Sequence, residues 1–317
     1  MIPIIQEREI LSLVKDLDLT LAMEEAFIAY SNGNTVVPPV GELLFNKPKG
    51  ETHIKYGYIK GDDFYCIKIA SGFYENTKLG ISSSQGLMLL FNQKTGEPVS
   101  VLLDGGNLTN IRTAAAGALA AKYFTPKNLK GIGIIGSGIQ GRLQLQYLQK
   151  NTPCKNVWIW DWDTKAAEKY KNELSADFNV QIVKTPHEVA RHANLIVTAT
   201  PSETPLLHAE DILPGTHITA VGSDTSAKQE LASEILVNAD LVISDSMSQS
   251  KSRGEIYQAQ KNPNFNANKI IELGTAIQDK NLCRKSEDQI SIVDLTGVAV
   301  QDIMIAKAVY LKYISQN

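Results

Sequence analysis

Cysteine is scarce in this sequence. Only Cys66, Cys154 and Cys283 occur among the 317 residues, and no C-x-x-C pair is present. An odd, scattered set offers no disulfide framework, so we expect a reducing environment in which the cysteines are packing residues. The five histidines form no H-x-x-x-H pair and have no cysteine beside them. A metal site is therefore not expected.

Long apolar runs and basic clusters are missing as well. No apolar run approaches the roughly 20 residues that span a bilayer. Residues 1–9 carry acids where a secretory signal has a basic region and an apolar core. The formal net charge of −3, without a run of Lys and Arg, argues against a nucleic-acid partner. We expect a cytoplasmic protein without membrane or nucleic-acid partners.

The chain is longer than one hydrophobic core usually serves, so two domains are expected. In the first part a helix is predicted to begin after Thr20 and to stop at 31–33 (Ser-Asn-Gly). Strand-like runs separated by Gly and charged turns follow, and they indicate antiparallel hairpins. These runs are 53–59, 64–70, 86–91 and 98–104. An Ala-rich helix is predicted over 111–124.

The second part alternates helices with short apolar strands, which is typical of a parallel sheet covered on both faces. A helix is expected over 165–174. Strands are expected at 131–135, 157–160, 181–183, 195–199, 216–221, 241–244 and 290–294. Apolar residues between Val300 and Leu311 have helical spacing, and we expect this last helix to pack on the first domain.

The most informative segment is 131–141, an apolar strand that runs into the turn Gly136-x-Gly138-x-x-Gly141. The first glycine permits a tight turn, the second lets the backbone approach a pyrophosphate, and the third lets helix and strand pack closely. Ile139 and Gln140 occupy the start of the following helix, whose N–H groups attract phosphate. A dinucleotide is the expected ligand, and a bland α/β turn is the alternative.

Asp161 ends the next strand, 20 residues beyond Gly141, where a carboxylate can accept hydrogen bonds from the ribose hydroxyls. It would also repel a 2′-phosphate, and no Arg follows it to bind one. We expect NADH to be preferred as coenzyme, with NADPH left open.

Several stretches together resemble the ornithine cyclodeaminase/mu-crystallin family. They are 66–70 (Cys-Ile-Lys-Ile-Ala), 80–85, 103–105, 108–116 with its Arg-Thr-Ala-Ala block, the glycine turn and 220–224. The resemblance implies an α/β protein: a discontinuous α+β substrate-binding and dimerisation domain (1–115 with 296–317) and a Rossmann domain with a doubly wound parallel sheet (116–295). It also implies a homodimer, and hydride transfer between NAD(P) and the α-carbon of an amino or imino acid in the cleft between the domains.

Matched residue by residue, the resemblance implies the following roles. Lys68 and Arg112 would bind the substrate carboxylate, and Lys68 would share in proton transfer. Arg112 and Thr113 would lie near the coenzyme pyrophosphate, and Ser83 and Ser84 near the nicotinamide end. Asp224 would be the catalytic acid/base, and Val298 would close over the nicotinamide.

The residues themselves allow different interpretations. On a strand, Lys68 points away from the face of Ile67 and Ile69, which also suits a solvated edge lysine. Arg112 is expected to open its helix, where a cation opposes the dipole and suggests a nearby anion. Asp224 follows a strand at the edge where α/β sheets bind ligands, or else it caps a helix.

Two departures from the family change the expected substrate. Pro38-Pro39 leads into Val40, where many members carry Arg, and Lys55 stands where the cyclodeaminase has an acid. Lys55 is either a solvated hairpin charge or a binding residue that suits an anionic substrate better than ornithine, whose side chain ends in a cation.

An NAD(P)H-dependent imino-acid reductase is therefore expected, with Δ1-pyrroline-2-carboxylate reduction to L-proline as the first choice. Iminosuccinate reduction is close behind, because Lys55 and His53 could hold a second carboxylate. Alanine dehydrogenase activity, ornithine cyclodeaminase activity and a mu-crystallin-like ligand-binding role without turnover also stay open.

Overall fold

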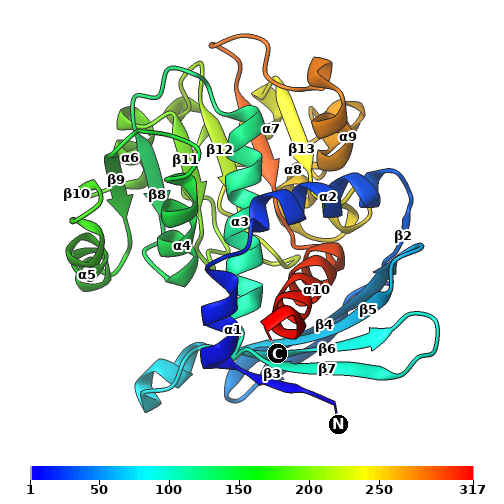
Figure 1. The fold of residues 1–317 in the computed structure, drawn as a ribbon. Coiled ribbons are helices and arrows are strands. Elements are labelled where there is room, and N and C mark those ends of the chain that lie inside the picture. Colours follow the sequence, from blue (N-terminus) through cyan, green and yellow to red (C-terminus); the bar gives the residue numbers. More distant parts are fainter. Residues whose placement is uncertain (1, 317) are drawn as a thin grey trace. The chain divides into compact units, whose positions relative to one another are not determined.

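The structure is a computed structural model that describes residues 2–316, and it divides into two compact units (Figure 1). Unit 1 contains the chain up to Arg112 and again from Val298, and unit 2 contains Thr113–Gly297. The first division falls inside helix α3 (Asn107–Phe124). The predicted limits, 115/116 and 295/296, lie within three residues of these points.

Unit 1 is built on one mixed sheet in the order β1-β7-β6-β5-β4-β2, with β3 also paired to β4. Only the β1–β7 pair is parallel. The four predicted strands form, and the hairpins between them are antiparallel as expected. The strands are β1 (Ile4–Gln6), β2 (Thr35–Val36), β3 (Gly41–Asn46), β4 (Lys49–Ile59), β5 (Phe64–Gly72), β6 (Ser84–Asn92) and β7 (Pro98–Leu103).

The helices of unit 1 are α1 (Glu7–Val14), α2 (Leu19–Ser31) and α10 (Ala299–Gln316), and a 3-10 turn spans Tyr74–Leu79. The predicted α2 forms where Asp18 caps it by accepting a hydrogen bond from the Leu21 N–H at 3.1 Å. In Figure 1 the red α10 lies beside the blue α2 and crosses strands β4 and β5, which it contacts. The last helix therefore packs within the first unit, as its apolar spacing predicted.

Unit 2 contains an eight-stranded, wholly parallel sheet in the order β10-β9-β8-β11-β12-β15-β13-β14. The chain starts at β8, builds outward on one side and then returns to build on the other, so a topological switch point lies between β8 and β11. The strands are β8 (Ile132–Ile135), β9 (Asn156–Trp160), β10 (Asn179–Ile182), β11 (Leu195–Thr198), β12 (His217–Ala220), β13 (Leu241–Ser244), β14 (Ile270–Glu272) and β15 (Ser291–Asp294).

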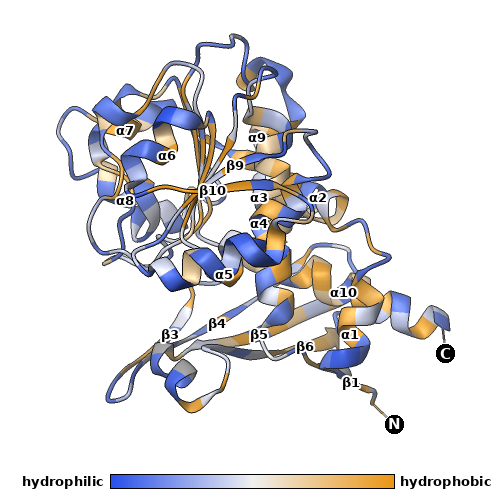
Figure 2. Cartoon of the chain, turned by 90° about the vertical axis from the view of Figure 1, so that its left-hand side faces the viewer, coloured by the Kyte–Doolittle hydropathy of each residue, from blue (hydrophilic) through white to orange (hydrophobic). Residues whose placement is uncertain are grey.

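Helices cover both faces of this sheet, and Figure 2 shows its orange strands enclosed by helices with blue outer faces. Because both faces are covered, β8, β11, β12, β13 and β15 are buried at every position. The Rossmann sheet predicted for this part is confirmed. The remaining helices are α4 (Ile139–Leu148), α5 (Thr164–Leu174), α6 (Pro186–His192), α7 (Ser233–Asn238), α8 (Gly254–Ala259) and α9 (Leu273–Gln278), with 3-10 turns at Ala209–Asp211, Gln249–Lys251, Ala267–Lys269 and Lys280–Leu282.

Helix α3 begins four residues earlier than predicted. The buried Asp104 carboxylate accepts a hydrogen bond from the Leu108 N–H at 2.7 Å, which satisfies one N–H of the first turn. Arg112 consequently lies in the second turn of α3. The prediction that Arg112 opens the helix was wrong, and the dipole argument for a nearby anion falls with it.

Among residues 2–316, no helix combines the length and the apolar character that a bilayer span requires.

Candidate active site

The glycine turn connects β8 to α4, with Gly138 as the residue that precedes the helix. Gly136 has φ +103°, and a Cβ there would lie 2.7 Å from the Ala199 carbonyl oxygen. A Cβ on Gly141 would lie 2.0 Å from the Gly136 carbonyl oxygen. Side chains are thus excluded at both positions, whereas nothing lies within 4 Å of a Cβ on Gly138. The backbone is open at the one glycine where a pyrophosphate would approach.

Asp161 follows β9 and is tied to this turn. Its Oδ2 accepts hydrogen bonds from both the N–H and the hydroxyl of Ser137, each at 2.7 Å, and its Oδ1 accepts one from the Asp163 N–H at 2.9 Å. The carboxylate is therefore fixed at the switch point of the sheet, next to the helix N-terminus.

Residues in the first turns of α4 lie beside the glycine turn. Ile139 is exposed and Gln140 is half-buried. The guanidinium of Arg142 donates to the Ser137 carbonyl oxygen, forms an ion pair with Glu173 at 2.6 Å, and lies over the ring of Tyr170. Its charge is thus already compensated inside unit 2.

Thr113 begins the part of α3 that belongs to unit 2, and its carbonyl oxygen accepts a hydrogen bond from the fully buried Gln144 side chain at 3.1 Å. This bond ties α3 to α4.

Unit 1 carries a buried group of cations. Lys55 on β4 and Lys68 on β5 are directly opposite one another in the register of the two strands, so their side chains share one face of the sheet. Lys68 is 2% exposed, Arg112 of α3 is 5% exposed and Lys55 is 6% exposed. The interpretation of these residues as solvated surface charges is thereby excluded. We call Lys55, Lys68 and Arg112 the cation cluster.

The first turn of α10 supplies the acceptors for this cluster. Asp302 Oδ1 accepts a hydrogen bond from Arg112 Nε at 3.0 Å, and Asp302 Oδ2 lies 3.4 Å from Lys68 Nζ. Gln301 Oε1 accepts from an Arg112 terminal nitrogen and from the Val298 N–H, both at 3.0 Å. Sequence analysis missed Gln301 and Asp302, because the spacing of apolar residues described α10 only as amphipathic. Two adjacent polar residues between Val300 and Ile303 were the available signal.

Burial dominates the electrostatics at Lys68. It lowers the pKa of the Lys68 ammonium, the Asp302 carboxylate partly opposes this, and the charge of Arg112 lowers the pKa further. The two buried cations Lys68 and Arg112 share the single carboxylate of Asp302, and this balance of charge favours an anionic ligand.

Ser83 and Ser84 lie at the start of β6 in unit 1, both half-buried. The Ser83 carbonyl oxygen accepts a hydrogen bond from the Phe73 N–H at 2.8 Å, and the Ser84 N–H donates to the Ser82 hydroxyl at 3.2 Å. Val298 is fully buried just before α10.

Asp224 lies in unit 2, in the loop after β12. Its carboxylate forms an ion pair with Lys228 at 2.7 Å, and its carbonyl oxygen accepts a hydrogen bond from Arg253 at 3.3 Å. The residues after Asp224 are not helical, so it is not a helix cap. The structure thus brings Lys55, Lys68 and Arg112 together in unit 1. In unit 2 it brings the glycine turn and Asp161 together, with Asp224 on a separate loop.

Three further acids are buried near the carboxyl ends of the strands of unit 2. Glu230 accepts hydrogen bonds from the backbone N–H groups of Thr200 and Gly222, Glu255 from those of Glu230 and Leu231, and Asp294 from that of Ile256. Burial raises the pKa of Glu230 to about 7, that of Asp294 to about 8, and that of Glu255 well above its usual value. These carboxyl groups fix the loops that follow β11 and β12.

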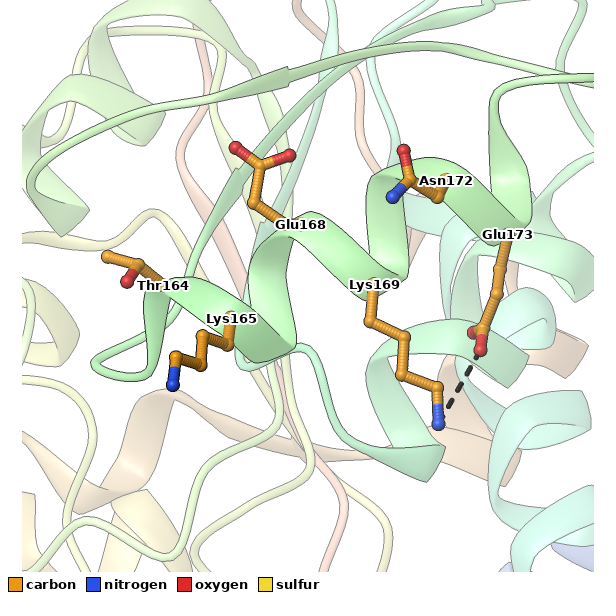
Figure 3. A pocket seen from close by; sticks show the side chains of 6 residues that line it. All are labelled: Thr164, Lys165, Glu168, Lys169, Asn172 and Glu173. Atoms are coloured by element: carbon orange, nitrogen blue, oxygen red, sulfur yellow. Dashed lines mark ion pairs between the residues drawn. The ribbon is translucent and has the colours of Figure 1, made fainter.

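A hollow on the outer surface of α5 lacks buried ionisable side chains. Figure 3 shows that its six lining side chains all come from this helix, and they are exposed to solvent. Lys169 and Glu173 are one helical turn apart on this surface and form an ion pair at 3.8 Å. The hollow offers no buried group for catalysis.

A parallel sheet of this order, with a glycine turn at the switch point and an acid fixed beside it, identifies an NAD(P)-dependent oxidoreductase. The chain belongs to the ornithine cyclodeaminase/mu-crystallin family, whose model matches residues 3–317. The predicted family and fold class are thereby confirmed.

Three solved structures are similar over almost their whole length. An archaeal alanine dehydrogenase dimer with bound NAD is 32% identical, with a TM-score of 0.90 over 100% of this chain and 97% of that chain. The Δ1-pyrroline-2-carboxylate reductase of Thermococcus litoralis, in complex with NADH and L-proline, is 26% identical, with a TM-score of 0.92 over 99% and 98%. The iminosuccinate reductase of Paracoccus denitrificans, in complex with NAD+, is 28% identical, with a TM-score of 0.88 over 99% and 97%.

The buried acids of unit 2 predict a pH-dependent stability. Because the pKa values of Glu230 and Asp294 are raised in the fold, the native state holds protons that the unfolded chain loses. Stability therefore falls as the pH rises from about 4 to about 8. Asp294→Asn, which resembles the protonated form, should flatten this fall. Thermal unfolding followed by circular dichroism from pH 5 to pH 9 measures the effect, and equal slopes in the two proteins would contradict it.

Proposed function

We propose that the protein is an NAD(P)H-dependent imino-acid reductase that forms an L-amino acid, with Δ1-pyrroline-2-carboxylate reduction to L-proline as its reaction. The observation that carries the proposal is the pair of buried cations Lys68 and Arg112, which share the single carboxylate of Asp302. Buried excess charge is costly unless a ligand compensates it, and a substrate carboxylate is an anion of the required kind. Membership of a family with imine-reducing relatives supports the same reaction.

In this proposal Arg112 and Lys68 bind the substrate carboxylate, Arg112 through the forked donors that suit a planar carboxylate. The bound coenzyme supplies a hydride to the carbon of the C=N bond. Lys68 or Asp224 gives the proton that the nitrogen takes up, since both are ionisable groups able to act as general acids. Lys55 adds positive charge beside Lys68, from the opposite strand position.

The glycine turn of unit 2 is proposed to hold the coenzyme. Gly136, Gly138 and Gly141 shape the turn, and the N–H groups around Ile139 and Gln140 face the pyrophosphate at the start of α4. Arg112 and Thr113 are proposed to contact the same pyrophosphate. Ser83, Ser84 and Val298 are proposed to line the nicotinamide end.

NADH is proposed as the preferred coenzyme. The Asp161 carboxylate is fixed by three hydrogen bonds, so it cannot easily turn away from a 2′-phosphate, which it would repel. Arg142, an arginine beside the turn, is held by Glu173 and Ser137 and is not free to bind that phosphate.

Two observations distinguish the competing substrates. A buried positive charge at Lys55 disfavours ornithine, whose side chain would bring a second cation to the same face. His53, which a second substrate carboxylate would need, lies 2.9 Å from the Glu42 carboxylate. A compact monocarboxylate such as Δ1-pyrroline-2-carboxylate is therefore proposed as the substrate in preference to iminosuccinate and ornithine. A pure binding protein has no need of the two ionisable groups Lys68 and Asp224.

The protein is also proposed to form a homodimer through the face of the unit 1 sheet opposite α10. This face alternates with the buried one along each strand and is apolar: it includes Tyr65 and Phe91, whose rings stack at 4.8 Å, and Ile67, Leu87 and Leu89. A half-exposed apolar sheet face of this kind marks a protein interface. The dimeric state of the archaeal alanine dehydrogenase supports a second copy as the partner.

Oxidation of NADH with Δ1-pyrroline-2-carboxylate should be observed at 340 nm. Lys68→Met should reduce kcat/KM by about 10²- to 10⁴-fold, because it removes both a carboxylate ligand and a proton donor. Lys60→Met, at an exposed turn of the same sheet, is the control and should keep wild-type activity. The proposal fails if no imine is reduced while ornithine releases ammonia.

Gly138→Ala should leave the thermal unfolding temperature unchanged, since its Cβ meets no protein atom. It should weaken NADH binding by about tenfold or more, a loss of about 1.4 kcal/mol, because the methyl group occupies the path of the pyrophosphate. Gly141→Ala should instead destabilise the fold by about 1–3 kcal/mol. Fluorescence titration with NADH and thermal denaturation separate the two effects; unaltered NADH affinity in Gly138→Ala would argue against this pyrophosphate site.

Asp161→Asn should shift coenzyme preference towards NADPH by about tenfold, since it removes a charge that repels the 2′-phosphate. Ser137→Ala removes one hydrogen bond to the same carboxylate without changing its charge, so it should keep the NADH preference. The ratio of kcat/KM for the two coenzymes is the measurement, and equal ratios in Asp161→Asn and wild type would contradict the assignment.

Light scattering should give the mass of a dimer. Ile67→Asp, which places a charge on the proposed interface, should yield a monomer that retains the circular dichroism spectrum of the wild type. A wild-type protein that is monomeric at micromolar concentration would rule out this interface.

A further inference from the structure

The first turn of α10 places one carboxylate between two of the three buried cations. We propose that Asp302 is a positioning residue: it keeps Lys68 in the ammonium form and fixes the direction of the Arg112 guanidinium. This inference rests on the proposed function, because it assigns a further residue to the same site.

Each carboxylate oxygen of Asp302 contacts one cation. Oδ1 accepts the hydrogen bond from Arg112 Nε at 3.0 Å, and Oδ2 lies 3.4 Å from Lys68 Nζ. Asp302 itself is 1% exposed, so water does not screen these interactions as it does at a surface. The carboxylate thereby sets the distance between the ammonium of β5 and the guanidinium of α3.

Gln301 completes the support of Arg112. Its side-chain oxygen accepts from an Arg112 terminal nitrogen and from the Val298 N–H. With Nε held by Asp302 and one terminal nitrogen held by Gln301, the guanidinium plane is fixed at two points. The other terminal nitrogen is then the one best placed to meet a ligand.

Asp302 lies in the first turn of α10, where the partial positive charge of the backbone N–H groups attracts a carboxylate. The helix thereby adds to the attraction that Lys68 and Arg112 exert on the same side chain.

Charged and titratable groups face Lys68 from several elements. They are Asp302 on α10, Arg112 on α3, Lys55 on β4 and Cys66 on β5, and Asp104 after β7 acts on the neighbouring Cys66 and Asp302. Burial lowers the pKa of Lys68, and among the charges of this group Asp302 is the strongest that raises it. Without Asp302, Lys68 would lose its proton at a lower pH and would no longer attract a carboxylate or donate a proton.

The first experiment measures kcat/KM against pH for wild type, Asp302→Asn and Asp302→Glu, with NADH and Δ1-pyrroline-2-carboxylate. At high pH the profile of kcat/KM should fall as Lys68 loses its proton. In Asp302→Asn this alkaline limb of the profile should move to lower pH by about one unit or more, which corresponds to a tenfold lower proton affinity of Lys68. Asp302→Glu retains the charge and should restore part of the wild-type limb.

Asp62→Asn is the matched control. Asp62 binds Lys307 of the same helix at 2.6 Å, in the turn between β4 and β5. Its replacement also breaks an ion pair of α10, but outside the cation cluster. The alkaline limb should stay at the wild-type pH. A purely structural role of Asp302 would give a uniform loss of activity without a shift of the limb, and that result would overturn the proposal.

A second readout does not require turnover. In protein labelled with [¹³C]lysine, the Cε resonance of Lys68, assigned by its absence in Lys68→Arg, reports protonation directly. Its titration should move to lower pH in Asp302→Asn and remain in place in Asp62→Asn. An unmoved titration overturns the role of Asp302 whatever imine is reduced. A shifted titration in a protein that reduces no imine supports the role of Asp302 and refutes the proposed reaction.

Discussion

The structure of unit 1 depends on the burial of the two cations Lys68 and Arg112 with one carboxylate, that of Asp302, as their shared partner. Lys55 and Lys68 come from adjacent strands, Arg112 from α3, and Asp302 from a helix 190 residues later in the chain than Arg112. Without Asp302, repulsion between Lys68 and Arg112 would oppose the packing of α10 on the sheet. This requirement explains why the C-terminal helix returns to the first unit: it brings the only carboxylate that contacts both Lys68 and Arg112 among residues 2–316.

In unit 2, carboxyl groups stabilise loops instead of buried cations. Loops after parallel strands expose backbone N–H groups, and here carboxyl groups accept hydrogen bonds from several of them. The half-buried Asp161 does so at the glycine turn, the buried Glu230 at the loops after β11 and β12, and the buried Asp294 at the start of α8. Side-chain acceptors give these loops a fixed form without regular secondary structure. The loops of the proposed coenzyme site are thus held by hydrogen bonds within the chain itself.

Local patterns were sufficient for much of the fold. Apolar runs bounded by turn residues predicted β4–β7 and most strands of unit 2, and the spacing of Gly136, Gly138, Gly141 and Asp161 predicted the loop at the switch point. The start of α3 was misplaced, because it depends on a carboxylate three residues before the helix. Asp302 and the buried acids of unit 2 were missed, because their partners are distant in sequence and only the folded chain brings them together. The family resemblance predicted roles for Lys68, Arg112 and Asp224, which the pattern of residues alone left open.

The separation in sequence between Asp302 and its two cationic partners has a consequence for biosynthesis. When Lys68 and Arg112 leave the ribosome, Asp302 has not yet been translated. Unit 1 therefore reaches its final packing only after α10 has been made, because that helix brings the carboxylate shared by Lys68 and Arg112.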